Sequence, residues 1–425
     1  MRELLVLCPR MPPYNGADAQ RVRTLLPFLA AHGWRATVLA LDAESDAGDL
    51  DETLLQTVSD EARIVRVRAW PRRWTRFAGV RQVALRAASP MRAALDRLLA
   101  TQRFDAGLVS TTDFALWPLS LRWPFPVVLD WQDPWLSTYY DEHPEVPRPG
   151  GALRYGLMQA HARRMEPRVA RHAAAHLVVS DAYRTLLCTR YPDLDPSRFL
   201  TLPFAASPND LRRARADPAV PDRLRGRRRW WVAAGRGGDD LHFACRALFE
   251  ALAVARARSP ARFEDFGMLF VGTAYDARRR ERPIAELAAR CGVADLVVEE
   301  PARIGVLETY RLMDAAEAVF VPGSDDPSYV ASKLAPCLLT GQPLLAALHA
   351  DSPAHGTAQV HAATRFIAFD PRRADAAEAL REAMRERWLA APLPARDPAP
   401  RLGLLDAGES AAALCGRLQR VVART

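Results

Sequence analysis

The sequence predicts an α/β protein built from two doubly wound domains, in which parallel strands alternate with covering helices. Three observations lead to this fold class. The chain has 425 residues, too many for one ordinary core, so two domains of about 200 residues each are expected. Short apolar runs alternate with longer segments of helical periodicity along most of the chain. Residues 210–229 combine prolines and charges with few apolar side chains, which favours a domain boundary there.

The composition is that of a globular enzyme. Hydrophobic residues make up 49% of the chain and charged residues 25%, which excludes a disordered tail. The net charge of +8 attracts nucleic acids, anionic membranes and anionic substrates alike. Charge by itself therefore selects none of these partners.

The cysteines and the apolar runs bear on location. The six cysteines are scattered and form no C-x-x-C pair, so neither a zinc site nor a disulfide framework is expected. They are typical of reduced core residues in a cytosolic protein. No apolar run reaches the length of about 18 residues that a membrane span needs, and the N-terminus begins directly with a strand pattern. We therefore expect a cytoplasmic protein.

The first domain opens with a strand at residues 3–7, a loop at residues 8–18 and a helix. One face of this helix carries Ala19, Val22, Leu25, Leu26 and Leu29. The loop contains Asn15 and Gly16, and Arg21 lies one turn into the helix. A flexible backbone at a helix start suits an anionic ligand, because the first amides carry partial positive charge. A tight turn without a ligand would use the same residue types.

Five further strands are predicted in this domain, at residues 36–41, 64–67, 106–109, 127–130 and 175–180. Residues 66–103 interleave arginines with tryptophans and aliphatic side chains. Such a segment suits an anionic membrane surface, and it equally suits an amphipathic helix packed on its own sheet. A nucleic-acid partner is disfavoured, because no binding module is recognisable.

Polar clusters follow two of these strands. Asp113 follows the strand at 106–109, and Asp130, Asp133 and Trp135 stand at the end of the strand at 127–130. Parallel sheets bind ligands at the carboxyl ends of their strands, where carboxylates and indoles would hold sugar hydroxyls and stack on a sugar ring. Asp133 would alternatively cap a helix begun by Pro134. No third ligand lies near the two aspartates of the second cluster, so no metal site is predicted.

The second domain repeats the alternation. Strands are predicted at residues 230–234, 266–272, 296–299, 318–321 and 366–369, with another from residue 343, and an amphipathic helix at 404–422 ends the chain. Gly235 and Arg236 lie in a glycine-rich turn between a strand and a helix, which is a phosphate cradle in physical terms. Alternatively, Asp239 and Asp240 would cap the helix and the loop would be only a turn. Gly272 and Thr273 leave a neighbouring strand and are expected to line the same cleft.

Residues 321–347 carry the strongest functional signal. A strand ends at Val321, a polar loop follows, and a short helix is expected at about 331–340 with a glycine stop at Gly341. Lys333, in the first helical turn, is the only lysine in a chain with 58 lysines and arginines. A compact ammonium beside helix-start amides suits a phosphate in a tight turn.

This stretch resembles the donor-binding segment of the family 4 glycosyltransferases of the GT-B type, whose common form is Ser-Lys-Leu-x-Glu-Tyr-Leu-x-x-Gly-x-Pro-Val-Leu-Ala. The matching residues are Ser332, Lys333, Leu334, Leu338, Gly341, Pro343, Leu345 and Ala346. The loop at 12–21 is similar to the family's Pro-Pro-x-x-Gly-Gly-x-x-x-Arg loop, and residues 130–135 resemble its Asp-x-Arg-Asp-x-Trp signature. Ser328 and Pro336 stand where the family has two glutamates. Asp325 or Asp326 would then bind the donor ribose in their place.

The resemblance implies two Rossmann-like domains facing across a cleft: residues 1–208, a linker at 209–228, residues 229–403, and a helix at 404–425 that crosses back to the first domain. The implied donor-binding residues are Asn15, Gly16, Gly235, Arg236, Gly272, Thr273, Asp325, Asp326, Ser328, Tyr329, Ser332, Lys333 and Leu334. Asp113, Lys333 and Arg236 are the expected catalytic residues, and Asp130, Asp133 and Trp135 are expected on the acceptor side.

The implied reaction moves a sugar from a nucleoside-diphosphate sugar to a glycan or lipid-linked acceptor, with retention and without a metal or other cofactor. Such a role belongs to cell-surface polysaccharide biosynthesis on the cytoplasmic side. If residues 66–103 meet anionic lipid, the protein is also peripheral on the inner face of the cell membrane. A sugar-nucleotide-binding subunit without catalysis and a nucleotide-sugar epimerase of the same architecture are the alternatives.

Overall fold

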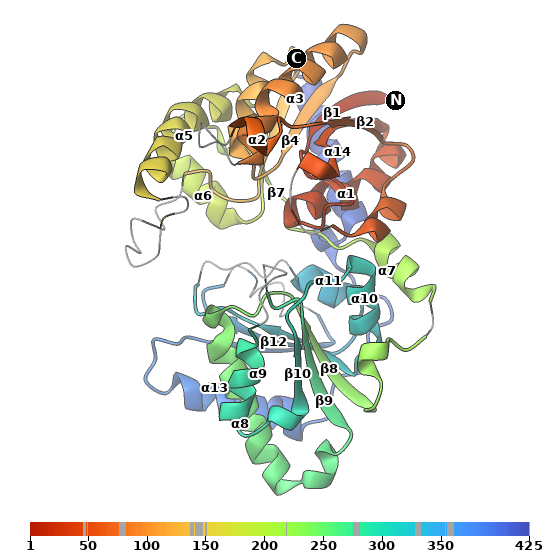
Figure 1. The fold of residues 1–425 in the computed structure, drawn as a ribbon, viewed down its shortest axis with the longest axis vertical. Coiled ribbons are helices and arrows are strands. Elements are labelled where there is room, and N and C mark those ends of the chain that lie inside the picture. The colour runs from red at the N-terminus through yellow and green to blue at the C-terminus, as the bar shows by residue number, and fades with distance from the viewer. Residues whose placement is uncertain are drawn as a thin grey trace. The chain divides into compact units, whose positions relative to one another are not determined.

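The structure is a computed structural model. It describes residues 1–45, 48, 50–75, 82–136, 140, 148, 151–217, 219–274, 281–327, 333–352, 354 and 361–424. The chain divides into two compact units (Figure 1). Unit 1 consists of Met1–Ala205 and Ala407–Thr425, and unit 2 consists of Ala206–Asp406.

Unit 1 is built on a parallel sheet of seven strands in the order β3-β2-β1-β4-β5-β6-β7. The strands are β1 (Arg2–Leu7), β2 (Trp34–Leu41), β3 (Arg63–Val67), β4 (Ala106–Ser110), β5 (Val127–Trp131), β6 (Ala175–Val178) and β7 (Phe199–Thr201). Leu7 lies opposite Leu39 of β2 and Val109 of β4. The strand order reverses between β1 and β4, which creates the crevice where doubly wound sheets bind ligands.

Helices cover both faces of this sheet. They are α1 (Ala17–Leu29), α2 (Arg72–Thr75), α3 (Val83–Thr101), α5 (Ala152–His172), α6 (Asp181–Arg190) and α14 (Ala407–Val422). On one face, side chains of α1 and α14 join Leu4 and Val6 of β1 in a single apolar cluster. On the other face, α3 and the C-terminal half of α5 pack around Leu5 and Leu7. This two-sided burial explains why the strands are almost continuously apolar.

The arginine-rich segment 66–103 is largely explained by this packing. In α3, Met91, Leu95 and Leu98 are buried against the sheet. The interpretation of this segment as a helix packed on its own sheet therefore holds for α3, while residues 76–81 lie outside the described part of the chain. Within the described ranges, none of the helices combines the length and the apolar character needed to cross a bilayer.

Unit 2 has a second parallel sheet, in the order β10-β9-β8-β11-β12-β13. Its strands are β8 (Arg229–Ala234), β9 (Phe266–Val271), β10 (Val297–Glu300), β11 (Ala318–Pro322), β12 (Leu344–His349) and β13 (Thr364–Phe369). Its helices are α7 (Pro208–Arg215), α8 (His242–Arg258), α9 (Pro283–Arg290), α10 (Val306–Ala315), α11 (Leu334–Leu339) and α13 (Ala376–Met384). Apolar clusters fill both faces of this sheet too, and its order reverses between β8 and β11.

Two segments differ from the sequence prediction. The stretch at 209–228, expected to link the domains, contains most of α7, which packs against α10 within unit 2 and buries Asp210 and Leu211. The helix expected at about 331–340 is α11, only six residues long. The helix is followed by Gly341, which has a φ of +71°. A Cβ added there would lie 1.8 Å from the carbonyl oxygen of Asp397, so the position admits no side chain.

Candidate functional site

In unit 2, a glycine-rich turn joins β8 to α8 at the point where the strand order reverses. Gly235 has φ +108°, a conformation that favours glycine. The amide of Gly237 donates to the carbonyl oxygen of Thr273 at 2.9 Å, and a Cβ on Gly237 would lie 2.8 Å from the Cβ of Thr273. The turn is therefore packed closely against the end of β9, with backbone exposed at the sheet edge.

Lys333 lies over this turn. A Cβ built on Gly235 would be 3.5 Å from Cδ of Lys333 and 3.9 Å from its Nζ. Burial raises the pKa of the Cys245 and Cys337 thiols to about 12, and the positive charge of Lys333 opposes part of that rise in both. Among the described residues, no carboxylate pairs with the ammonium. Within the described part of the chain, Lys333 is therefore a cation without a paired carboxylate at the crevice where doubly wound sheets bind ligands.

Arg236 was predicted to contact a phosphate directly, but in the structure its guanidinium is paired with a carboxylate. Its guanidinium donates two hydrogen bonds to the carboxylate of Asp240, at 2.6 and 2.5 Å. Burial would raise the pKa of Asp240, but hydrogen bonds from Arg236 and Ser324 outweigh it, and the pKa lies below its usual value. A diphosphate would therefore have to share Arg236 with Asp240 or displace that carboxylate.

The loop after β11 brings two carboxylates to the same place. The amide of Asp325 donates to the carbonyl oxygen of Asp240 at 2.9 Å, and the amide of Asp326 donates to the Ser324 hydroxyl at 3.0 Å. Both aspartates are exposed. Burial, followed by the negative charge of Asp240, raises the pKa of Asp325. The two carboxylates therefore stand at the surface next to the Arg236–Asp240 pair.

Several other predicted donor residues have different positions. Leu334 is 3% exposed and belongs to the core, so it contributes packing rather than a ligand contact. The Thr273 hydroxyl donates to buried Glu299 at 2.6 Å, which ties it into the unit. Gly272, with φ +70°, turns the chain at the end of β9. Ser328, Tyr329 and Ser332 lie outside the described residues.

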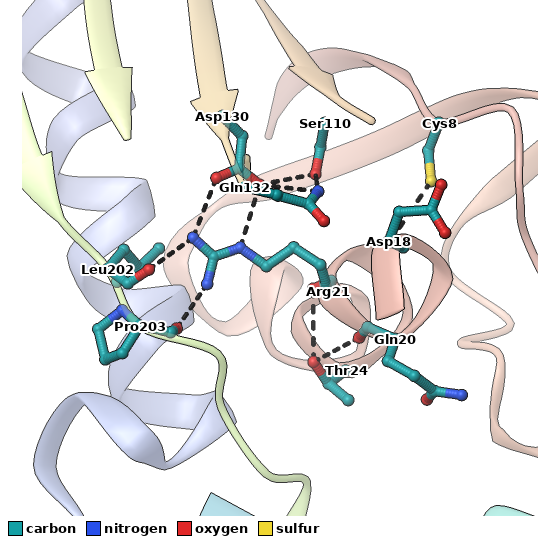
Figure 2. A network of polar contacts seen from close by, with 10 residues as sticks. All are labelled: Cys8, Asp18, Gln20, Arg21, Thr24, Ser110, Asp130, Gln132, Leu202 and Pro203. Atoms are coloured by element: carbon teal, nitrogen blue, oxygen red, sulfur yellow. Dashed lines mark hydrogen bonds and ion pairs between the residues drawn. The ribbon is translucent and has the colours of Figure 1, made fainter. Parts of the chain in front are cut away.

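In unit 1, a buried ion pair lies at the carboxyl end of β5, between Arg21 and Asp130 (Figure 2). Arg21 on α1 donates to both oxygens of Asp130 at 3.0 Å, and to the carbonyl oxygens of Leu202 and Pro203. The hydroxyl of Ser110 donates to the same aspartate at 2.7 Å. Because Asp130 is 1% exposed and its oxygens are occupied, the prediction that it holds acceptor hydroxyls is wrong. Its role is to fix α1 and the end of β7 to β5.

A second charged cluster stands at the same sheet edge. Arg10 follows β1 and contacts Asp18 at 3.2 Å and Asp113 at 2.8 Å. Asp113 begins the 3-10 helix Phe114–Arg122, and its amide donates to the Thr111 hydroxyl at 3.0 Å. Burial raises the pKa of Asp18, and Arg10 offsets part of this rise. Two carboxylates therefore share one guanidinium, beside a cavity that reaches Asp113.

The loop residues predicted to meet a ligand are packed against Tyr14. Gly16 precedes α1, and a Cβ there would lie 2.2 Å from the ring of Tyr14. The guanidinium of Arg10 covers the same ring at 5.4 Å. Asn15 accepts a hydrogen bond from Gln20 at 3.0 Å. These contacts give Asn15 and Gly16 a structural role, because they fix the shape of the loop.

A cavity of about 800 Å³ opens at the carboxyl ends of β1, β4 and β5. Arg10, Asp113 and Trp135 line it, together with side chains of α3 and α5. The Trp135 indole is parallel to the Phe114 ring, with centroids 5.5 Å apart. Asp133 is exposed, and no helix begins at Pro134 in the described segment, so the capping alternative is wrong. Nor do the described residues contain a group of three or more metal-ligating side chains.

Sequence reasoning missed Arg10 and Asp18, and it missed the pairing of Asp240 with Arg236. Arg10 and Asp18 lie in the loop that had been selected for its glycine and helix start, at the strand where the order reverses. Asp240 is four residues after Arg236, a spacing that favours an ion pair. Both signals were present in the sequence, whereas the cavity walls from α3 and α5 depend on how these helices pack.

No family model matches the chain, and no curated protein matches it. Solved structures do match its fold. Sucrose-phosphate synthase from Thermosynechococcus elongatus has a TM-score of 0.56 at 16% identity, covering 99% of this chain and 95% of that one. Anabaena HepE in complex with UDP and glucose has a TM-score of 0.54 at 15% identity, covering 100% and 98%. UDP-GlcNAc 2-epimerase from Methanocaldococcus jannaschii has a TM-score of 0.55 at 11% identity, covering 99% and 100%.

The sheets and these likenesses define the fold class. Each unit is a doubly wound α/β unit of the Rossmann-like type, and the whole chain has the fold of GT-B glycosyltransferases. The predicted fold class is confirmed.

Proposed function

We propose that this protein is a glycosyltransferase that uses a nucleoside-diphosphate sugar as its donor. The observation that carries the proposal is the Lys333 ammonium, which lies over the exposed Gly235 turn at the β8–β11 crevice and has no carboxylate partner among the described residues. An anionic ligand is favoured where such a cation stands at the ligand-binding edge of a doubly wound sheet. Two of the similar structures support the choice of ligand, because HepE is described in complex with UDP and glucose and with UDP-glucose.

The chemistry follows from the charges. When the bond between the sugar and the diphosphate breaks, negative charge builds on the departing oxygen. Lys333 would receive this charge directly, and Arg236 would do so once the diphosphate competes with Asp240 for its guanidinium. One preorganised donor of this kind is worth roughly 100-fold to 1,000-fold in rate. The exposed carboxylates of Asp325 and Asp326 would bind the ribose hydroxyls.

Unit 1 would supply the acceptor side. Asp113 lines the cavity and is held in place by Arg10 at 2.8 Å. Its carboxylate would accept a hydrogen bond from the attacking hydroxyl and so orient the oxygen. Because Arg10 stabilises the charged carboxylate, the hydroxyl proton is transferred to the departing diphosphate. The motif resemblance supports retention and activity without a metal.

The test is thermal stabilisation by nucleotide sugars. A ligand present at about 100 times its dissociation constant adds roughly 2.7 kcal/mol of stability. UDP-glucose, UDP-GlcNAc and GDP-mannose would be screened against the full chain and the variant Lys333→Met. The matched control is Arg228→Met, which removes one charge from a side chain that is 89% exposed. We expect stabilisation of the wild type and of the control and none of Lys333→Met. Absence of stabilisation by any of these donors, or equal stabilisation of all three proteins, would refute the proposal.

An epimerase is the second candidate, because the UDP-GlcNAc 2-epimerase from Methanocaldococcus jannaschii shares the fold at a TM-score of 0.55. An epimerase interconverts free nucleotide sugars and needs no acceptor. Incubating the protein with UDP-GlcNAc alone, and analysing the sugar by NMR spectroscopy, separates the two activities. Conversion to a second free nucleotide sugar would favour the epimerase. A donor that stays unchanged alone and is consumed when an acceptor is added would favour the transferase. A donor that binds and is never consumed would indicate a binding subunit.

A further inference from the structure

The cavity of unit 1 has one charged end and two apolar walls. Arg10, Thr112 and Asp113 form the charged end, at the carboxyl ends of β1 and β4. The walls come from the first turns of α3 and from the N-terminal half of α5. A ligand that fills this space would place a polar group at the sheet edge and an apolar group between the helices.

The α5 wall exposes large aliphatic side chains. Leu153 is 81% exposed and Leu157 is 66% exposed, four residues apart on one side of the helix. Met158 is 41% exposed, and Leu85 of α3 is 45% exposed on the opposite wall. Exposed apolar residues scattered singly need no explanation, but several around one cavity mark a binding surface. Met158 adds an unbranched side chain that adapts to flexible apolar ligands.

The same walls are poorly suited to a sugar chain. Sugars bind to free aromatic faces and to paired hydrogen-bonding groups. One face of the Trp135 indole is covered by Phe114, and Trp117 meets it edge-on at 5.9 Å. The polar lining side chains away from the charged end are Gln82, Arg154, Tyr155, Gln159 and His161. The exposed side chains of Leu85, Leu153, Leu157 and Met158 between them are aliphatic, and a sugar hydroxyl buried against these four would lack a hydrogen-bond partner.

We propose that this cavity binds the aliphatic chain of an amphiphilic acceptor, with the hydroxyl at Asp113 and the chain between α3 and α5. The inference rests on the proposed function, because that hydroxyl is the group that receives the sugar. Its oxygen bonds to the anomeric carbon while the bond from that carbon to the diphosphate breaks. The diphosphate leaves with the electron pair and takes up the hydroxyl proton. The cavity of about 800 Å³ lies within the range typical of sites that enclose small-molecule ligands.

The experiment uses n-alkyl β-glucosides as probes, in chain lengths from methyl to octyl and below their micelle concentrations. Isothermal titration calorimetry on the full chain measures the dissociation constant of each probe. Burial of one methylene tightens binding by up to about fourfold, so the constant is expected to fall by twofold to fourfold per added carbon. Phenyl β-glucoside serves as the aromatic comparison and is expected to bind more weakly than the octyl compound.

Matched variants show where the alkyl chain of the probe binds. The double variant Leu153→Gln/Leu157→Gln changes two exposed side chains, so the fold is retained. We expect this double variant to bind octyl glucoside at least tenfold more weakly and to show no dependence of affinity on alkyl chain length. Its affinity for methyl glucoside should be unchanged. Leu153→Met/Leu157→Met is expected to preserve the dependence. Leu186→Gln on α6, where the leucine is 38% exposed outside the cavity lining, is the control and is expected to have no effect.

The outcomes separate this inference from the proposed function. Binding that is independent of chain length, tighter binding of the phenyl compound, or equal octyl affinity in the double variant would each overturn the inference. If nucleotide sugars still stabilise the protein in those cases, the proposed function stands without it. If no nucleotide sugar stabilises the protein, the acceptor assignment falls with the proposed function, whatever the alkyl series shows.

Discussion

The buried pair between Arg21 and Asp130 makes a quantitative prediction about unit 1. Arg21 is 3% exposed and Asp130 is 1% exposed. Arg21→Met leaves the carboxylate buried with only the Ser110 hydroxyl at 2.7 Å and the more distant Gln132 amide at 3.4 Å. It also removes the donors to the carbonyl oxygens of Leu202 and Pro203. Breaking a buried pair costs about 3–5 kcal/mol, so we expect unit 1 to lose about 4 kcal/mol of stability.

Hydrogen exchange is the appropriate assay, because a chain of two units does not unfold in one step. Amides of β4 and β5 exchange through the opening of unit 1, and each 1.36 kcal/mol changes the exchange rate about tenfold. Arg21→Met is therefore expected to accelerate their exchange roughly 1,000-fold. The control is Arg171→Met, because Arg171 donates to both oxygens of Asp193 with a similar geometry at the surface. That control is expected to change nothing measurable, and similar exchange rates in the two variants would refute the argument from burial.

Three further predictions concern other sites. Burial lowers the pKa of His176 to about 3, and the Nδ1 atom of His176 accepts a hydrogen bond from the Trp131 indole. In the unfolded chain the same imidazole takes up a proton below about pH 6.5. The free energy of unfolding should therefore decrease as the pH is lowered from 6.5 to 3. His176→Gln should reduce this slope in urea titrations, and an unchanged slope would contradict the assignment. Gly341→Ala should cost more stability than Gly292→Ala. Both glycines have positive φ, but a Cβ added at Gly341 would lie 1.8 Å from the Asp397 carbonyl oxygen, whereas a Cβ added at Gly292 would meet nothing within 4 Å. Left-handed strain alone is about 1–2 kcal/mol, and equal melting temperatures of the two variants would argue against the close contact. Asp113→Asn should lower kcat about 100-fold with little change in donor affinity, because the acceptor hydroxyl is no longer held in position. An unaltered kcat would remove Asp113 from the acceptor site.

Local patterns predicted the strands well, for physical reasons that apply to particular residues. Residues 106–109 and 318–321 are short apolar runs because each is buried on both sides in a parallel sheet. The strands in the structure extend these runs by one residue, to Ser110 and Pro322. Polar residues that follow such strands were correctly placed at one sheet edge, because parallel strands end together.

Contacts between distant residues were beyond prediction. Arg21 and Asp130 are 109 residues apart, and nothing near either residue indicates that they neutralise each other. Asp130 therefore appeared to be a ligand contact when it is a buried structural anion. The arginine and aspartate at positions 236 and 240 have a recognisable helical spacing, yet the glycine-rich context indicated a phosphate cradle, a helix cap or a plain turn rather than an ion pair. The segment at 209–228 was misjudged because prolines and charges also occur in a short amphipathic helix such as α7.

Chemical labelling of Lys333 tests the central claim most directly. It is the only lysine in the chain, so an amine-directed reagent has only the N-terminal amine as a competitor. The half-buried ammonium over the Gly235 turn should react in the free protein and be protected by a saturating nucleotide sugar, as measured by mass spectrometry of the labelled peptides. Lys333→Arg should lose most transfer activity, because a planar fork replaces a compact charge. Equal labelling with and without the nucleotide sugar, together with an active Lys333→Arg variant, would contradict the proposed donor site.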